Sequence, residues 1–292
     1  MGGGGTTRLS RTALAVWAAL IVLFLLFPIV LIVLYAFNPS NVQSWPLGGL
    51  STKWFSSTFH DQGMRDALWL SVRAGLISTT IAVVLGSMAA FAVHRFRFFG
   101  RETISFLLVL PLALPGIITG MALNSFFAFG GVSFSLTTIV IGHATFCIVT
   151  VYNNALARLR RTQTSLVEAS MDLGADGWQT FRHVTLPVVA TALVAGGLLA
   201  FALSFDEVIV TTFTAGAQNT LPLWIFGNIR LGQSLPQVNV VVLMVIVVTI
   251  VPVTLAQRLT RDTGVLRVGG GGAGGGRRSA GSRAAVAAEP AP

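Results

Sequence analysis

The sequence predicts an all-α, polytopic membrane protein, and three observations support that class. Of its 292 residues, 53% are hydrophobic and only 10% are charged, whereas about a quarter of the residues in soluble domains are charged. Six stretches are apolar over the roughly 20 residues that a membrane-crossing helix needs. Basic residues concentrate in alternate connections, as membrane topology requires. The six predicted transmembrane helices are residues 13–37, 69–93, 104–128, 137–157, 188–211 and 238–257.

The first apolar stretch, Ala13–Phe37, carries no charge and follows Arg8 and Arg11. A secretory signal peptide also begins with basic residues, but its apolar region is only about 7–15 residues long and ends in small residues. This stretch is longer and ends in the sequence Leu-Tyr-Ala-Phe. We therefore expect an uncleaved membrane anchor.

The basic residues predict that both termini are cytoplasmic. Of the 19 Lys and Arg residues, 15 lie on the side of the termini, three lie on the other side, and Arg73 lies within the second stretch. Lys and Arg are enriched in cytoplasmic connections, so we attribute the net charge of +9 to topology and expect no nucleic-acid partner.

The terminal segments fall outside the predicted membrane domain, which spans residues 13–257. Residues 1–12 include a run of glycines, and residues 258–292 are rich in Gly, Ala and Arg. Such segments cannot bury enough apolar surface to offset the loss of chain entropy. We expect a disordered N-terminus and a basic, largely disordered tail, both cytoplasmic.

The third and fourth stretches contain helix-breaking and polar residues. Pro111 and Pro115 are predicted to kink the third stretch. Asn124, Asn153 and Asn154 are polar side chains within apolar stretches. Each of these amides would either donate a hydrogen bond to a neighbouring helix, as is common in bilayers, or contact a substrate.

The fifth stretch ends in two adjacent carboxylates, Asp206 and Glu207. Ionisable residues within membrane spans are costly and often functional. One interpretation is that the pair attracts a cationic substrate at the outer mouth of a pathway. The other is that Arg73 neutralises one carboxylate in an ion pair between helices. Adjacent residues on a helix point about 100° apart, so we expect the two not to face one pore together.

A polar segment, residues 158–187, separates the fourth and fifth stretches on the predicted cytoplasmic side. Ser165 and Glu168 have the spacing of a capping box, which predicts a helix over residues 166–173. Gly174 suits the left-handed position after a helix end, and residues 176–179 can begin a second short helix. The segment therefore predicts a helical hairpin followed by a membrane span.

Apolar residues recur at helical spacing along this hairpin: Val167, Met171, Gly174 and Trp178. Periodicity alone leaves two alternatives open. The hairpin either lies on the bilayer as an amphipathic element or docks into a partner protein.

The same segment resembles the EAA loop of binding-protein-dependent ABC importer permeases. The matching residues are Glu168-Ala169-Ser170, Gly174 and Val184-x-Leu186-Pro187, with Ser170 in place of the usual Ala. The resemblance implies the type I ABC importer permease fold, in which this loop is the coupling helix that grips an ATPase. The residues expected to form the coupling loop are Glu168, Ala169, Ser170, Asp172, Gly174, Leu186 and Pro187.

Two further segments, His143–Cys147 and Leu203–Val208, resemble the second permease subunit of spermidine/putrescine-type importers. This resemblance implies that the chain forms half of the translocation pathway for a small solute, for which a polyamine is the first choice and another small solute the alternative. The residues expected along that pathway are Asp206, Glu207, Asn124 and Tyr152.

The resemblance also implies partners and a location. Two ABC ATPase subunits, or a dimer of one, would use ATP and Mg. A homologous first permease subunit would complete the pathway, and an extracytoplasmic solute-binding protein would deliver the solute. The chain would be a multi-pass protein of the bacterial inner (plasma) membrane that binds no cofactor itself.

Motifs for catalysis are missing from the sequence. The single lysine, Lys53, does not stand in the G-x-x-x-x-G-K-[ST] phosphate-binding pattern. The four histidines are scattered, no metal-ligand cluster occurs, and the lone Cys147 cannot form a disulfide within the chain. An ion-coupled secondary transporter is the main rival, but such a protein would need ion-binding groups at mid-membrane. A channel would need a selectivity filter and a membrane enzyme would need an active-site constellation, and the sequence shows neither.

Overall fold

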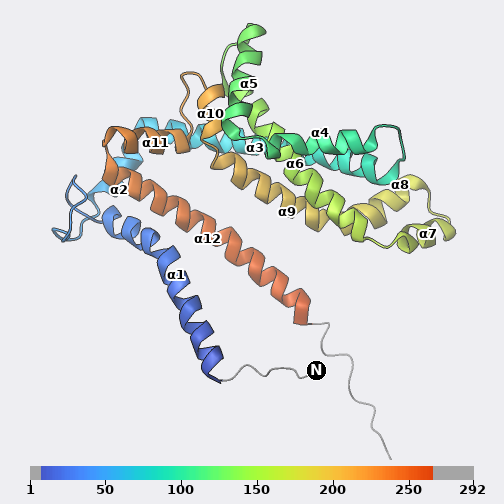
Figure 1. Cartoon of the computed structure of the whole chain (residues 1–292), viewed down its shortest axis with the longest axis horizontal. Coiled ribbons are helices and arrows are strands. Elements are labelled where there is room, and N and C mark those ends of the chain that lie inside the picture. Colours follow the sequence, from blue (N-terminus) through green and yellow to red (C-terminus); the bar gives the residue numbers. More distant parts are fainter. Residues whose placement is uncertain (1–7, 266–292) are drawn as a thin grey trace, which may run out of the picture. The chain divides into compact units, whose positions relative to one another are not determined.

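A computed structural model describes residues 8–265, and the surroundings of side chains from residue 10 to residue 250 (Figure 1). The described residues form helices joined by loops, with no β-strand among them. The chain divides into two units, Met1–Val242 and Leu243–Pro292, and the second unit's described part is the end of helix α12, Leu235–Val265.

Helices α3 (Gln62–Arg95), α6 (Leu136–Arg161) and α9 (Leu186–Phe205) pack against one another and form the core of the first unit. The most apolar window of α6 is 67% buried, against 28% and 22% for the spans containing α3 and α9, so α6 is the central helix. Close packing depends on small residues. A Cβ added at Gly86 of α3 would lie 2.8 Å from the carbonyl oxygen of Ile148 on α6.

Among the described residues, four helices are long and apolar enough to cross a membrane, or five if one bent pair counts as a single span. The first of them, α1 (Arg8–Ala36), is followed by those containing α3, α6 and α9. The predicted sixth stretch corresponds to α12. The part of α12 whose side chains are described, Leu235–Ile250, is apolar but shorter than a full membrane span.

The predicted third span is broken rather than kinked. It consists of α4 (Arg101–Ala113) and α5 (Gly116–Phe129), and the helix direction bends by 105° between them. Pro115 lies at the break and holds Leu114 in extended geometry, because the residue before a proline avoids the helical region. Pro111, by contrast, is accommodated inside α4.

The predicted fifth span, 188–211, is also discontinuous. Helix α9 ends at Phe205, and a separate helix, α10 (Ile209–Thr214), follows after three residues. The expectation of a continuous helix through Asp206 and Glu207 is therefore wrong. At the break the Glu207 side chain accepts a hydrogen bond from the Val210 amide, which lies in the first turn of the new helix.

Two short helices organise the connections predicted to be outer. Helix α2 (Lys53–His60) is fixed by Trp54, whose indole Nε1 donates to the Asn38 carbonyl at 2.8 Å. Helix α11 (Leu221–Leu231) is joined to α3 because Ser71 Oγ accepts from the Leu221 amide at 2.8 Å. The predicted aromatic connections are therefore structured.

The predicted terminal segments extend beyond the described residues. Helix α1 begins at Arg8 and α12 continues to Val265. Residues 8–12 and 258–265, for which we expected disorder, are therefore helical in the structure. Arginine favours helix nearly as well as alanine, and extending a formed helix is easier than nucleating one. The prediction of disorder for residues 1–7 and 266–292 lies outside the described residues.

Candidate functional site

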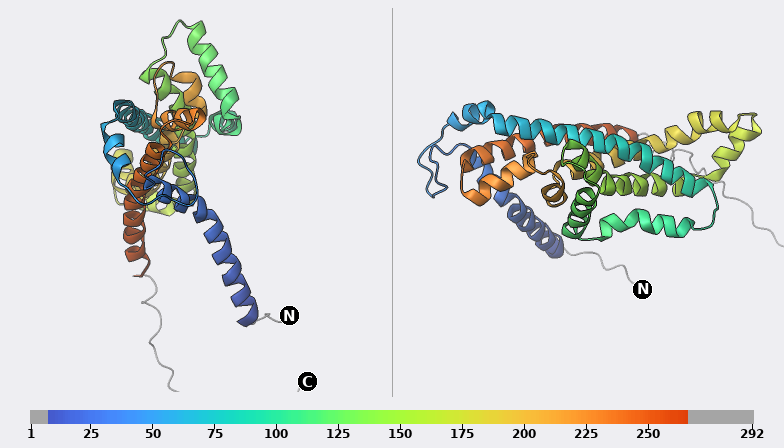
Figure 2. Two further views of the ribbon diagram at one scale, coloured as in Figure 1. Left: turned by 90° about the vertical axis from the view of Figure 1, so that its left-hand side faces the viewer. Right: turned by 90° about the horizontal axis from the view of Figure 1, so that it is seen from above.

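The segment between α6 and α9 is a helical hairpin located beyond the ends of those two helices (Figures 1 and 2). Its first helix, α7 (Thr164–Asp172), ends in a Schellman motif. The amide of Gly174 donates to the Met171 carbonyl at 2.9 Å, and the amide of Ala175 donates to the Ser170 carbonyl at 3.1 Å. Gly174 has φ +88°, which confirms its predicted left-handed conformation.

The second helix of the hairpin, α8 (Gly177–Thr180), begins with a capping box. Asp176 Oδ1 accepts from the Gln179 amide at 2.7 Å, and Gln179 Oε1 accepts from the Asp176 amide at 3.0 Å. A π-helical turn, η1 (Phe181–Thr185), then leads into α9, where Pro187 occupies the first turn.

The predicted capping box at Ser165 and Glu168 is wrong. Helix α7 begins at Thr164 after Gln163, with no side-chain cap. Ser165 therefore lies within the first turn, where its backbone is already helical, and a capping residue must precede the helix with non-helical geometry. The sequence has capping-box spacing at Ser165 and Glu168 and again at Asp176 and Gln179. Only the second pair, which follows the Gly174 turn, forms a capping box.

Side-chain contacts hold the two arms of the hairpin together and to the bundle. Ser170 Oγ lies 3.1 Å from Thr180 Oγ1, which joins α7 to α8. The ring of Phe181 stacks on Trp178 at a centroid distance of 5.7 Å and meets Phe91 of α3 edge-on at 5.3 Å. Ser170, which stands where the EAA pattern usually has Ala, therefore makes a hydrogen bond that an alanine could not make.

The predicted apolar stripe divides between two surfaces. Val167 and Met171 line a cavity of about 610 Å³ between the hairpin and the ends of α3 and α6, together with Phe91. Trp178, in contrast, is 67% exposed. Leu173, which the sequence analysis did not single out, is 90% exposed at the hairpin tip. Its position directly before a helix-ending glycine was the signal that could have identified it.

The predicted coupling residues are gathered on this hairpin and its exit. Glu168, Ala169 and Asp172 are exposed on α7, and Glu168 also borders the cavity beside His94 and Arg95. Ser170 lies on α7 and Gly174 at the turn that follows it, and Leu186 and Pro187 form the first turn of α9.

At the opposite end of α9, the two carboxylates occupy different environments. Asp206 is the exposed residue that terminates α9. Glu207 is half-buried, and its Oε1 accepts from the Val210 amide at 2.9 Å. Within the described part of the chain neither carboxylate forms an ion pair, so the alternative in which Arg73 neutralises one of them is not observed.

The break between α9 and α10 is bridged by His143 of α6, which is 1% exposed. Its Nδ1 lies 2.7 Å from Ser204 Oγ and its Nε2 lies 2.8 Å from Thr211 Oγ1. The Thr211 hydroxyl donates its single hydrogen to the Glu207 carbonyl, so we assign the imidazole hydrogen to Nε2 and the acceptor role to Nδ1. The sequence indicated only that the histidines are scattered, and it did not predict this bridge.

The remaining pathway candidates serve contacts between helices. Asn124 Nδ2 of α5 donates to the Phe213 carbonyl of α10 at 2.7 Å, which is the interhelical alternative for this residue. Tyr152 is buried, and its hydroxyl donates to Ser105 Oγ of α4 at 3.0 Å. Asn154 instead donates to the Thr150 carbonyl of its own helix.

No group of three or more His, Cys, Asp or Glu residues that could hold a metal ion occurs among the residues the structure describes.

Comparisons with known proteins agree on one family. A family model described as a binding-protein-dependent transport system inner membrane component matches residues 82–263. The chain is 35% identical to the putrescine transport system permease protein PotI of Escherichia coli K12 over 232 residues, covering 76% of this chain and 82% of that protein. It is 31% identical to the spermidine/putrescine transport system permease protein PotC of the same strain over 241 residues, covering 82% and 90%.

Solved structures share the fold at low sequence identity. A chain of a bacterial ABC transporter involved in the import of the acidic polysaccharide alginate matches with a TM-score of 0.62 at 19% identity, covering 88% of this chain and 99% of that chain. A chain of the MetNI methionine ABC transporter in an inward-facing conformation matches with a TM-score of 0.55 at 18% identity, covering 69% and 94%.

Proposed function

The chain belongs to the family of binding-protein-dependent transport system inner membrane components, and from this premise we propose that it passes a polyamine through the membrane. It is a multi-pass permease subunit of an ABC importer and a non-catalytic transport component. Putrescine and spermidine are the solutes named for the relatives that it resembles over most of its length.

The observation that carries the choice of a cationic solute is the acidic break after α9. A helix C-terminus has partial negative charge from its free carbonyl groups, and the exposed Asp206 adds a full negative charge at the same point. A polyamine is a flexible cation near neutral pH, so this position suits an amino group entering or leaving the pathway. Glu207 lies at the same break, and Asn124 would support it through its bond to α10. Tyr152 would line the pathway farther along, where it packs with Val189 near the start of α9.

Helix α9 connects the two functional regions. It has 20 residues and is therefore about 30 Å long, with the hairpin at its N-terminal end and the acidic break at its C-terminal end. A displacement of the hairpin by a partner would thus be transmitted along one helix to the carboxylates. In this proposal Glu168, Ala169, Ser170, Asp172, Gly174, Leu186 and Pro187 form the coupling loop.

The complete importer in this proposal contains two ATPase subunits, or a dimer of one, which hydrolyse ATP with Mg. A homologous first permease subunit completes the pathway, and an extracytoplasmic binding protein delivers the solute. This chain would cross the membrane six times with both termini in the cytoplasm, a topology supported by the 15 basic residues on one side.

Uptake by the reconstituted complex tests the solute. Proteoliposomes containing the importer, internal ATP and external binding protein should accumulate radiolabelled putrescine or spermidine, and omission of ATP should stop this accumulation. Uptake of another solute without uptake of either polyamine would contradict the polyamine assignment while leaving the importer role intact.

A further inference from the structure

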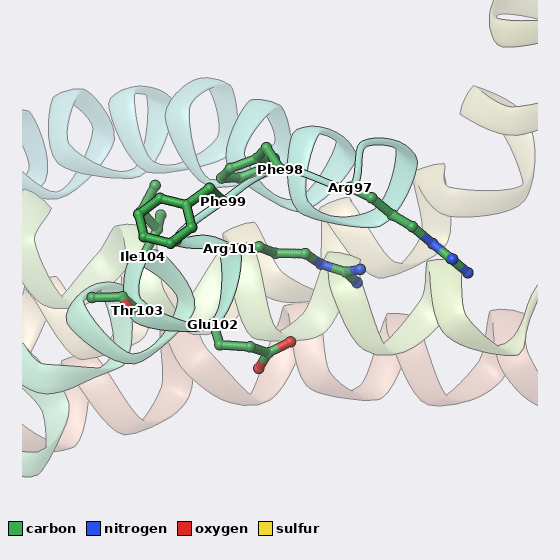
Figure 3. A pocket seen from close by; sticks show the side chains of 8 residues that line it. Arg97, Phe98, Phe99, Arg101, Glu102, Thr103 and Ile104 are labelled. Atoms are coloured by element: carbon green, nitrogen blue, oxygen red, sulfur yellow. The ribbon is translucent and has the colours of Figure 1, made fainter.

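The loop between α3 and α4 combines arginines with exposed aromatic rings. Its sequence is Arg95-Phe96-Arg97-Phe98-Phe99-Gly100-Arg101. All three phenylalanines are exposed, and Phe99 makes almost no contact with the rest of the chain, with a relative exposure of 105%. Residues Arg97–Ile104 line an open cavity of about 860 Å³. Figure 3 shows the Arg97 and Arg101 side chains extending in the same direction, away from Phe99 and Ile104.

Arginines outnumber carboxylates at this loop, where Arg97 and Arg101 share the cavity with one acidic residue, Glu102. The Nε of Arg101 is buried without a hydrogen-bond partner, which is costly for a charged donor. Among the residues whose side chains are described, no carboxylate forms an ion pair with Arg97 or Arg101. Arg101, Arg160 and Arg95 all act electrostatically on His94, so guanidinium groups from three helices share this region. An anion from outside the chain would satisfy these groups.

We propose that this loop binds the phosphate head group of an anionic phospholipid in the cytoplasmic leaflet. Arginine matches phosphate through paired N–H donors, and basic clusters next to membrane helices attract anionic lipids. The phenylalanine rings would lie at the boundary between head groups and acyl chains.

The surface next to the loop favours lipid over an acidic protein as the partner. Helix α4 begins at Arg101, is largely apolar, and buries none of its residues completely. Phe106 and Leu107 on this helix are exposed, so the aromatic loop continues an apolar surface suited to hydrocarbon. A protein surface that paired with the arginines would leave this apolar surface uncovered.

Native mass spectrometry of the purified importer tests the proposal. The complex would be equilibrated in detergent with equal amounts of phosphatidylglycerol and phosphatidylcholine of different mass. Wild type should retain phosphatidylglycerol preferentially, and excess inorganic phosphate should not displace it. Arg97→Gln should reduce this retention roughly fivefold, the effect of one arginine at an anionic surface. Arg230→Gln, at an exposed arginine of α11, removes the same charge and should retain the lipid.

Phe99→Ala should weaken retention of phosphatidylglycerol without a change in charge, and the exposure of Phe99 makes misfolding of this variant unexpected. Equal retention of both lipids by wild type would overturn the proposal. So would Arg97→Gln with unchanged lipid retention and weakened ATPase binding, since that result would assign the arginines to an acidic protein surface. Neither readout depends on the identity of the transported solute.

Discussion

His143 and Thr211 are joined by a hydrogen bond of 2.8 Å between the imidazole Nε2 and the threonine Oγ1. The same imidazole bonds Ser204 at 2.7 Å, so one buried side chain on α6 connects the last turn of α9 with the first turn of α10. The break that carries Asp206 and Glu207 is therefore held on both sides by the central helix.

Replacement of His143 by leucine should destabilise the protein. The change leaves the Ser204 hydroxyl buried without its partner and removes the donor to Thr211, at a cost of about 1–3 kcal/mol for an unsatisfied buried group. Thermal unfolding of the purified complex measures the effect as a lower Tm. Thr211→Ser keeps the hydroxyl and serves as the control, and equal Tm values for His143→Leu and wild type would refute the bridge.

Gly174→Ala should uncouple the hairpin, whereas Gly177→Ala should not. A Cβ added at either glycine meets no atom within 4 Å, but only Gly174 has the left-handed φ of +88°. A non-glycine residue there costs about 1–2 kcal/mol and disturbs the Schellman turn. Solute-stimulated ATP hydrolysis should fall for Gly174→Ala and stay near wild type for Gly177→Ala. Similar activities for both variants would show that the turn conformation is not required.

Leu173→Ala should weaken binding of the ATPase without loss of protein stability. The side chain is 90% exposed, so it contributes little to packing within the chain. An apolar anchor in a partner's groove commonly contributes more than 1 kcal/mol, which corresponds to a roughly fivefold loss of affinity. Phe129→Ala, at a residue that is 96% exposed on α5, is the matched control. Titration of the permease with purified ATPase would distinguish the two variants.

Asp206→Asn should impair uptake of polyamines more than Glu207→Gln. Glutamine can still accept the hydrogen bond from the Val210 amide that Glu207 accepts now, whereas asparagine removes the exposed charge at the end of α9. Loss of one charge near a cation corresponds to about 1 kcal/mol at a solvated site, so the KM for putrescine should rise roughly fivefold. A larger effect of Glu207→Gln would assign the solute contact to that residue instead.

The sequence predicted the membrane class, the location of the hairpin and its left-handed glycine, because composition and turn chemistry are local properties. It predicted a kink from Pro111 and Pro115 but not the complete break at Pro115, and it did not predict the break at Glu207. Both segments are apolar on each side of the break, and hydrophobicity alone cannot show where a helix changes direction. At the second break the Glu207 side chain accepts from the Val210 amide of the following helix, but a glutamate at this position could equally have continued α9.

The hydrogen bonds between residues far apart in the chain could not be predicted from the sequence either. The bonds of His143 join residues 61 and 68 positions apart, and that of Asn124 joins residues 89 positions apart. Side chains of the same type can bond within their own helix, as Asn154 does. Only the packing of α5, α6 and α10 determines which polar group finds a partner on another helix.

The most direct test of the account is ATP hydrolysis by the complex isolated through a tag on this chain. If the hairpin couples the permease to ATP hydrolysis, an ATPase should co-purify, and binding protein loaded with putrescine or spermidine should stimulate hydrolysis. Glu168→Ala and Gly174→Asp should remove the stimulation. The absence of a co-purifying ATPase, or full stimulation of both hairpin variants, would contradict the claim that this hairpin couples the permease to ATP hydrolysis.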